Sequence, residues 1–296
     1  MNNTLLKQAG ILIALFFLVS LNAWSEETFK PFVLVSSEAT DFNGAVDTTK
    51  NKLQSGGFTI AGEYSPYDGA HVIVVTSNEL QAAAAKSEFG GYGSVIRVSV
   101  TQNGDKIEVA YSNPLYWGKA FRLAEDLTAV ANKMESAMGK GEPFGSKDGL
   151  IAKKLMIYHY KIMMPYFDDP HTLASFDSYA DAMAKINEGL AAGKGGVSKV
   201  FEVKIPGKDE SLIGVAITEG DGADKNIMDK IDVHGTRHTA HLPYAMLVSG
   251  NKAYTLSGKF RIALSFPDLS MMGKGSFMEI MDAPSGIENS LSSVAK

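Results

Sequence analysis

The same order of predicted secondary-structure elements occurs twice along the chain, and this repetition constrains the fold more than any other feature. In the first half, an extended apolar segment at residues 29–39 precedes a helix that begins after Asp41, a suitable N-cap. A longer helix at 119–138 closes this half. Between the two helices, a short helix at 79–87 interrupts four strand-like segments, at residues 58–64, 71–76, 94–101 and 106–111.

The second half repeats this order after a glycine-rich stretch at residues 139–149. An extended segment is expected at 156–164 and a helix after Ser178. A closing helix is expected at 276–294, with a break or kink at Pro284. A short helix near 223–231 again separates the second and third of four predicted strands, at residues 200–205, 212–218, 244–248 and 253–266.

We therefore predict an α+β fold of two tandem β-α-β4-α units. The first α+β domain is expected at residues 26–139, a linker at 140–152 and the second α+β domain at 153–296. Units of this size are typical of single domains.

The first 25 residues have the features of a cleaved signal peptide. Lys7 precedes an apolar run at residues 10–21, which is shorter than the roughly 20 residues needed to span a bilayer. Ala23 and Ser25 are small residues at the positions that a cleavage before Glu26 requires. A retained N-terminal anchor is the alternative interpretation. We predict a periplasmic or secreted protein whose mature chain has no stable membrane span.

Composition excludes several classes of function. The chain has no cysteine, so it has no disulfide, no thiolate metal site and no cysteine nucleophile. A net charge of −5 argues against nucleic acid as a partner, because such binding depends on neutralising phosphates. The sequence also contains no P-loop, no G-x-S-x-G nucleophile elbow and no H-E-x-x-H motif, so it favours a binding protein over an enzyme.

Short motifs add a family resemblance to this pattern. Gly57-Phe58 follows the first helix and Asn113-Pro114 follows the last strand of the first half, while Gly196-Val197 and Phe266-Pro267 are their weaker counterparts. With these motifs and its exported β-α-β4-α units, the chain resembles two divergent tandem copies of the domain-of-unknown-function family 302. The resemblance implies a TATA-binding-protein-like fold, in which an antiparallel sheet grips a long helix. It implies no reaction, because the family brings no catalytic residues.

A histidine cluster in the second half is the first candidate site. Asp232, His234, His238 and His241 lie within ten residues of one another. Imidazoles with a carboxylate are a typical ligand set for a divalent transition metal. The alternative is a polar loop whose histidines pair with backbone groups and nearby carboxylates.

The corners that follow the last strand of each half form the second candidate site. Asn113 and Trp117 lie at the first corner, where aromatic side chains can line the mouth of a cavity between sheet and helix. Lys259 and Arg261 would share one face of the strand at 253–266 and would bind an anion, with Tyr244 from the strand before it. Alternatively, the aromatic residues close the end of the core and the basic face is solvated.

These features favour a non-enzymatic, exported module that binds a small molecule or another envelope protein. The alternative is a metal-binding protein or metal-dependent enzyme centred on the histidine cluster. A structural component of an envelope assembly is the third possibility, and it would carry an exposed apolar patch.

Overall fold

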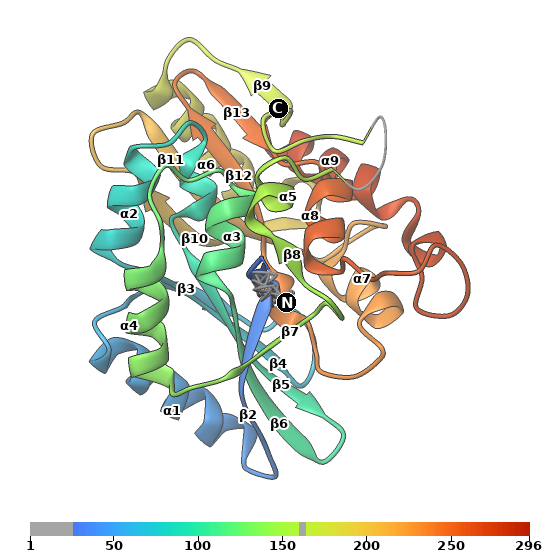
Figure 1. Cartoon of the computed structure of the whole chain (residues 1–296). Helices are drawn as coiled ribbons and strands as arrows, with labels where there is room; N and C mark the ends of the chain where they lie inside the picture. Colours follow the sequence, from blue (N-terminus) through green and yellow to red (C-terminus); the bar gives the residue numbers. More distant parts are fainter. Residues whose placement is uncertain (1–25, 160–163) are drawn as a thin grey trace, which may run out of the picture.

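A computed structural model describes residues 26–159 and 164–296, so the predicted signal peptide lies outside the described residues. Helices and antiparallel sheets alternate along the chain, which confirms the α+β class (Figure 1). Among the described residues, no helix has the length and apolar character needed to cross a membrane.

The first half forms a sheet with the strand order β3-β4-β5-β6-β2-β7. Strand β7 (Glu142–Phe144) comes from the segment that was expected to be a linker, and it pairs with β2. The other elements of this half are β2 (Phe32–Glu38), α1 (Phe42–Ser55), β3 (Thr59–Tyr64), β4 (Ala70–Thr76), α2 (Asn78–Ala85), the 3-10 turn η1 (Gly90–Gly93), β5 (Ile96–Asn103), β6 (Lys106–Ser112), α3 (Pro114–Ala120) and α4 (Thr128–Met138).

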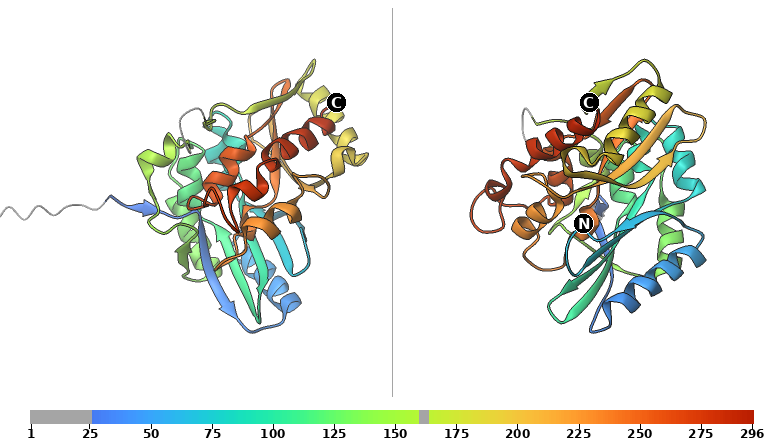
Figure 2. Two further views of the ribbon diagram at one scale, coloured as in Figure 1. Left: turned by 90° about the vertical axis from the view of Figure 1, so that its right-hand side faces the viewer. Right: turned by 180° about the vertical axis from the view of Figure 1, so that it is seen from behind.

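The second half forms a sheet with the strand order β10-β11-β12-β13-β9, which matches the order of the first five strands of the other sheet. Figure 2 shows both halves from two further sides. Its elements are β9 (His171–Ser175), α6 (Tyr179–Ala191), η2 (Lys194–Gly196), β10 (Val197–Lys204), β11 (Glu210–Ile217), α7 (Asp224–Ile231), η3 (Thr239–His241), β12 (Tyr244–Ser249), β13 (Lys252–Thr255), α8 (Gly258–Ser265), η4 (Phe277–Ile280) and α9 (Ala283–Val294). From β2 to α4 and from β9 to α9, strands and α-helices follow one another in the same order.

Local signals in the sequence explain several of these boundaries. The Asp41 carboxylate accepts a hydrogen bond from the backbone N–H of Gly44 at 2.6 Å and so caps α1. Ser178 caps α6 in the same way. Gly104 and Asp105 form the hairpin turn between β5 and β6, with Gly104 at a φ of 66° that favours glycine.

Side chains alternate between two cores along the central strands. On β4, Val72 and Val74 belong to a central core that also contains residues of the second half, whereas Ile73 and Val75 face an outer core under the helices of the first half. Helices α1 and α4 lie against each other over that outer face (Figure 1). A second outer core lies between the other sheet, α6 and α9. The layers therefore run helix, sheet, sheet, helix.

The two sheets approach each other at strands β3 and β10. Each of these strands carries a bulge where the register shifts, between Ile60 and Gly62 in β3 and between Lys199 and Phe201 in β10. A Cβ atom at Gly62 would lie 2.1 Å from the Val200 carbonyl oxygen, so only glycine permits this approach.

The strand predicted at 253–266 is wrong beyond Thr255, because residues 258–265 form helix α8. In this segment Phe260, Ile262 and Leu264 alternate with more polar residues, as they would in a strand. The helix is buried on most of its sides, so its sequence does not show the helical period of 3.6 residues.

The single long helix predicted at 119–138 is also wrong, because it is two helices. Asn113 caps α3 and Pro114 occupies its first turn, so this helix begins before the predicted one. Arg122 has a φ of 50°, which ends the helical path, and α4 begins at Thr128.

The segment that joins the halves differs from the prediction as well. The first strand of the second half is β9 rather than residues 156–164, of which 160–163 lie outside the described residues. Residues 140–152 contain β7 and also β8 (Leu150–Ile151), which pairs with β1 (Thr28–Phe29). Helix α5 (Ala152–Met156) follows directly, and its Leu155 is part of the central core.

Candidate functional site

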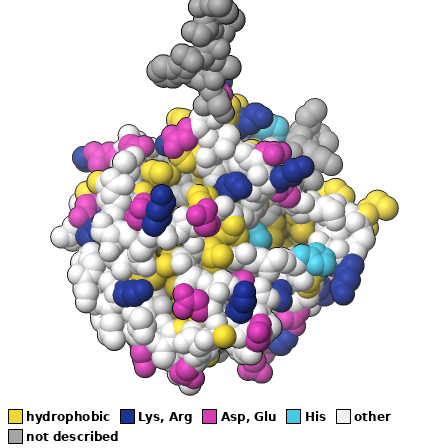
Figure 3. Space-filling view, turned by 60° about the horizontal axis from the view of Figure 1, so that its bottom comes forward, with side chains coloured by type: hydrophobic (Ala, Val, Ile, Leu, Met, Phe, Trp, Pro, Cys, Tyr) yellow, Lys and Arg dark blue, Asp and Glu magenta, His cyan; other side chains and the backbone are white. Residues whose placement is uncertain are grey.

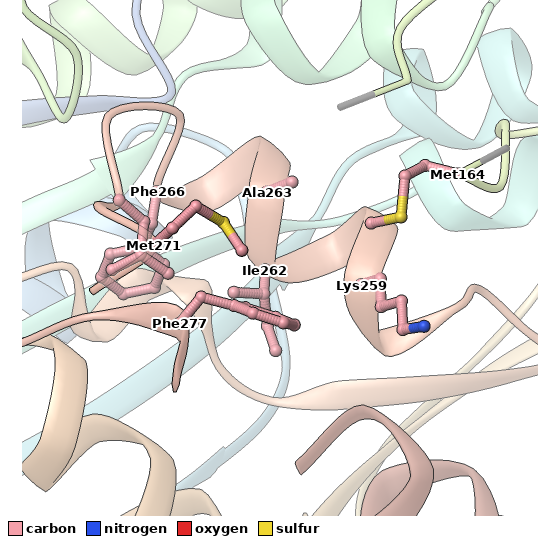
Figure 4. A pocket seen from close by; sticks show the side chains of 8 residues that line it. Met164, Lys259, Ile262, Ala263, Phe266, Met271 and Phe277 are labelled. Carbon is pink, nitrogen blue, oxygen red and sulfur yellow. The ribbon is translucent and has the colours of Figure 1, made fainter. Parts of the chain in front are cut away.

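An apolar pocket lies between the outer side of α8 and the segment that follows it (Figure 4). Phe266 and Phe277 gather at one end of the pocket, and Met164 and Lys259 lie at the other (Figure 4). The lining residues are Met164, Lys259, Ile262, Ala263, Phe266, Leu269, Met271 and Phe277. Lys259 is the only ionisable residue in this set.

The volume of this pocket is about 160 Å³. An apolar cavity of about 150 Å³ is large enough to hold a benzene molecule. The pocket therefore has room for one aromatic ring or a short aliphatic chain.

Backbone hydrogen bonds within the segment after α8 close the outer wall of the pocket. The N–H of Phe277 donates to the Ser270 carbonyl at 2.9 Å, and the N–H of Met278 donates to the Met271 carbonyl at 3.3 Å. The Glu279 carboxylate accepts from the N–H of Gly275 at 2.6 Å. These contacts hold Met271 and Phe277 across from α8.

A second, more polar pocket adjoins the first one at Met164 and Lys259, which line both. His171 and Glu288 also line it, and their side chains are 3.2 Å apart. None of the ion pairs between described residues involves Lys259. An ammonium group that is not ion-paired to any residue in the described ranges thus lies where the apolar and polar pockets meet.

Three residues of the predicted anion site come together, but they lie in the interior and not at the mouth of a cavity. They are Arg261, Tyr244 and Trp117. The Arg261 guanidinium lies over the Trp117 ring at 4.6 Å from its centroid, and Arg261 and Tyr244 line the same small cavity. Lys259 is on the opposite side of α8. The prediction that Lys259 and Arg261 share a face is therefore wrong, because it assumed a strand.

Asn113 has a structural role at the start of α3. Its carboxamide oxygen accepts from the N–H of Leu115 at 3.1 Å, and its nitrogen donates to the Lys30 carbonyl at 2.9 Å. The equivalent residue in the second half is Ser257, which precedes α8. Phe266 follows that helix, so pairing Phe266-Pro267 with Asn113-Pro114 is wrong.

The three histidines of the predicted metal site point to different partners. His241 is buried, with Nδ1 at 2.7 Å from Ser265 Oγ and Nε2 at 2.8 Å from the Tyr244 hydroxyl. Burial, together with the nearby Arg261 and Arg97, holds the pKa of His241 well below its usual value, so its ring is neutral.

His238 packs among aromatic rings and is stacked on Phe266 at 4.7 Å between centroids. Its Nδ1 lies 3.2 Å from Asp232 Oδ1, and its backbone N–H also donates to that carboxylate. His234 is exposed near Gly275. Within the part of the chain that the structure describes, no three His, Asp or Glu side chains are arranged to hold a metal ion. The predicted metal site is not assembled.

Four residues of the apolar pocket were not predicted from the sequence. They come together only because α8 and the segment after it fold against each other, and no local sequence pattern indicates this contact. These residues are Ile262, Leu269, Met271 and Phe277. Arg97 lines the small cavity with Arg261 and was not predicted either. The sequence does contain a signal for it, because it is a charged residue within a strand that is otherwise apolar or small, Ile96-Arg97-Val98-Ser99-Val100.

Comparison of the chain with protein-family models, with curated proteins and with solved structures finds no match. The proposed function therefore rests on the geometry of the site and on the sequence.

Proposed function

We propose that the protein is an exported, non-enzymatic binding module that holds a small apolar molecule with an acidic group. The observation that carries this proposal is the Lys259 ammonium, which lies at the end of an apolar pocket and forms no ion pair with another described residue. A ring or short chain would lie between Ile262 and Phe277, and its carboxylate would meet Lys259, where the polar pocket begins.

The chemistry of the lining supports binding rather than catalysis. Apart from Lys259, the lining consists of aliphatic, aromatic and methionine side chains, which provide no nucleophile beside a base. Methionine adapts its shape to different ligands, which suits Met164 and Met271 in the lining. Charged side chains of both signs are interspersed on the face that Figure 3 shows, so that face has no broad basic area of the kind that binds nucleic acid.

Two features of the sequence-based prediction remain part of the proposal. Export to the periplasm or beyond the cell rests on the signal-peptide pattern of residues 1–25. The likeness to two tandem copies of the domain-of-unknown-function family 302 rests on Gly57-Phe58, Gly196-Val197 and Asn113-Pro114, and the shared strand order of the two sheets supports a duplicated unit.

The test uses methyl-13C-methionine protein and NMR, with hexanoate and benzoate as probes and hexanamide and benzamide as their uncharged counterparts. We expect saturable shifts of the Met164 and Met271 methyl signals, whereas Met134, fully buried in the outer core of the first half, stays unchanged. The acids should bind about tenfold more tightly than the amides, because only they pair with Lys259.

Three variants sharpen this test. Lys259→Met should remove the preference for acids, while Lys252→Met, which replaces an exposed lysine on β13, should retain it. Ala263→Phe should block both kinds of probe by filling the pocket. Unchanged Met164 and Met271 signals at millimolar probe concentrations would refute binding at this site. Equal affinity for acids and amides would refute the role of Lys259.

A further inference from the structure

Two arginine side chains are buried close together where the halves of the molecule meet. Arg97 belongs to β5 of the first sheet and Arg261 to α8 of the second half, and each is only 5% exposed. Both line an enclosed cavity whose other walls are also buried, made by Tyr92, Phe121, Tyr244, Ala245, Thr255 and Leu256.

The hydrogen bonds of the two guanidinium groups go to uncharged acceptors. Arg97 Nε donates to the Pro243 carbonyl at 3.3 Å. Arg261 donates to the His241 carbonyl and, at 3.5 Å, to Ser265 Oγ. These contacts satisfy some of the donors, but they bring no negative charge.

No ion pair between described residues involves either arginine. The nearby buried acids have other partners. Glu210 accepts from the N–H of Gly91 at 2.9 Å and from the Ser249 hydroxyl at 3.0 Å. Asp224 accepts from the Tyr64 hydroxyl at 2.8 Å.

Two like charges in a buried, weakly polarisable region are costly unless an opposite charge accompanies them. Burial lowers the pKa of Arg261 to about 10, and for Arg97 burial and the charge of Arg261 both lower the pKa. Arginine keeps its proton at neutral pH, so the region holds two positive charges.

We propose that the cavity between Arg97 and Arg261 is a binding site for one monatomic anion, with chloride as the ligand. The cavity has about 10 Å³ of free space, which corresponds to a single water-sized species and excludes phosphate, sulfate and organic acids. Tyr92 is also part of the cavity wall, and the Leu256 amide interacts with its hydroxyl.

The position of this site makes the anion a link between the halves. One guanidinium comes from each half, so the ligand would be bound only when both sheets are in place. This role is independent of the apolar pocket, because Lys259 and the pocket lie on the other side of α8.

The first experiment measures thermal unfolding at constant ionic strength while sodium chloride replaces sodium gluconate. We expect the Tm to rise with chloride, by roughly 5–10 °C at a hundred times the dissociation constant. Arg97→Met and Arg261→Met should abolish this dependence. Arg122→Met should keep it, because Arg122 pairs with Asp168 at the surface. A Tm that does not respond to chloride in the unmodified protein would overturn the proposal.

The second experiment needs no variant. Crystals of the full mature chain grown in sodium bromide should show an anomalous bromine peak between the two guanidinium groups. A water molecule at that position, or bromide bound only at the surface, would contradict the proposal.

Discussion

Helix α8 separates two cavities of opposite character, and two basic residues on it show the difference. Lys259 is exposed beside an open apolar pocket, whereas Arg261 is buried in a closed polar region. Residues two apart in a helix are rotated by about 200° from each other, so they face opposite sides. Similar side chains thus lie in different surroundings, with an open apolar pocket on the outer side and a buried region without a counter-charge among the described residues on the inner side.

This comparison predicts that inner substitutions change stability and that outer ones change binding. The inner polar region also contains a hydrogen bond that connects the halves, from the Tyr64 hydroxyl of the first half to the Asp224 carboxylate of the second. Three substitutions test the difference between the two sides of α8, in order of decreasing expected effect.

Asp224→Asn should have the largest effect. Burial raises the pKa of Asp224 to about 7, from an ordinary 3.8, and its Oδ1 has no hydrogen-bond partner among described residues. Since the folded-state pKa is the higher one, the protonated acid supports the fold below about pH 4. That stability is lost as the pH rises to about 7. The loss is at most about 4 kcal/mol.

Urea unfolding of Asp224→Asn at pH 4 and pH 8 measures this contribution. The variant should be more stable than the unmodified protein at pH 8 by up to about 4 kcal/mol, and nearly equal at pH 4. Asp229→Asn is the matched control, because Asp229 is an exposed acid on the same helix that pairs with Lys225. An Asp224→Asn variant that is less stable at pH 8 would show that the carboxylate supports the fold.

Gly62→Ala should have the next largest effect, because the two sheets meet at this residue. The new Cβ would lie 2.1 Å from the Val200 carbonyl oxygen and 2.8 Å from Phe201 Cβ, so the strands must move apart. We expect a loss of about 1–3 kcal/mol in the free energy of unfolding, measured with urea. Thr59→Ala, at an exposed site on the same strand, should change it by less than about 0.5 kcal/mol. Equal effects would argue against the close approach of β3 and β10.

Tyr116→Phe should have the smallest effect of the three. The Tyr116 hydroxyl on α3 donates to the Leu264 carbonyl on α8 at 2.8 Å, in a fully buried position. Its removal should lower the free energy of unfolding by about 1 kcal/mol. Lys259→Met, on the outer side of α8, should leave it within about 0.5 kcal/mol. A larger loss from Lys259→Met than from Tyr116→Phe would reverse the assignment of the two sides.

Much of the fold could be predicted from local chemistry. The cap at Asp41, the Asn103-Gly104 hairpin and the repeated element order all depend on neighbours in sequence, and the structure has them. Helix α8 could not be predicted, because its sides meet two different cores and its sequence mimics a strand.

The candidate site was predicted only in part. Arg261 does lie over Trp117 and line a cavity with Tyr244. Arg261 and Trp117 are on the helices that follow the last strand of each half, and Tyr244 begins β12. The histidine cluster did not become a metal centre, because His241 uses both ring nitrogens in a buried network and His238 packs among rings. Such outcomes depend on long-range packing, which spacing along the chain does not record.

The pairing of β7 and β8 has a consequence for the order in which the chain can acquire its structure. Strand β2 lies between β6 and β7, and β1 has β8 as its partner. Strand β1 and one edge of β2 therefore have backbone partners only once residues 142–151 are in place. During synthesis, the first half becomes complete only after the connecting segment has emerged, and a chain that stops at Met138 would leave one side of β2 unpaired.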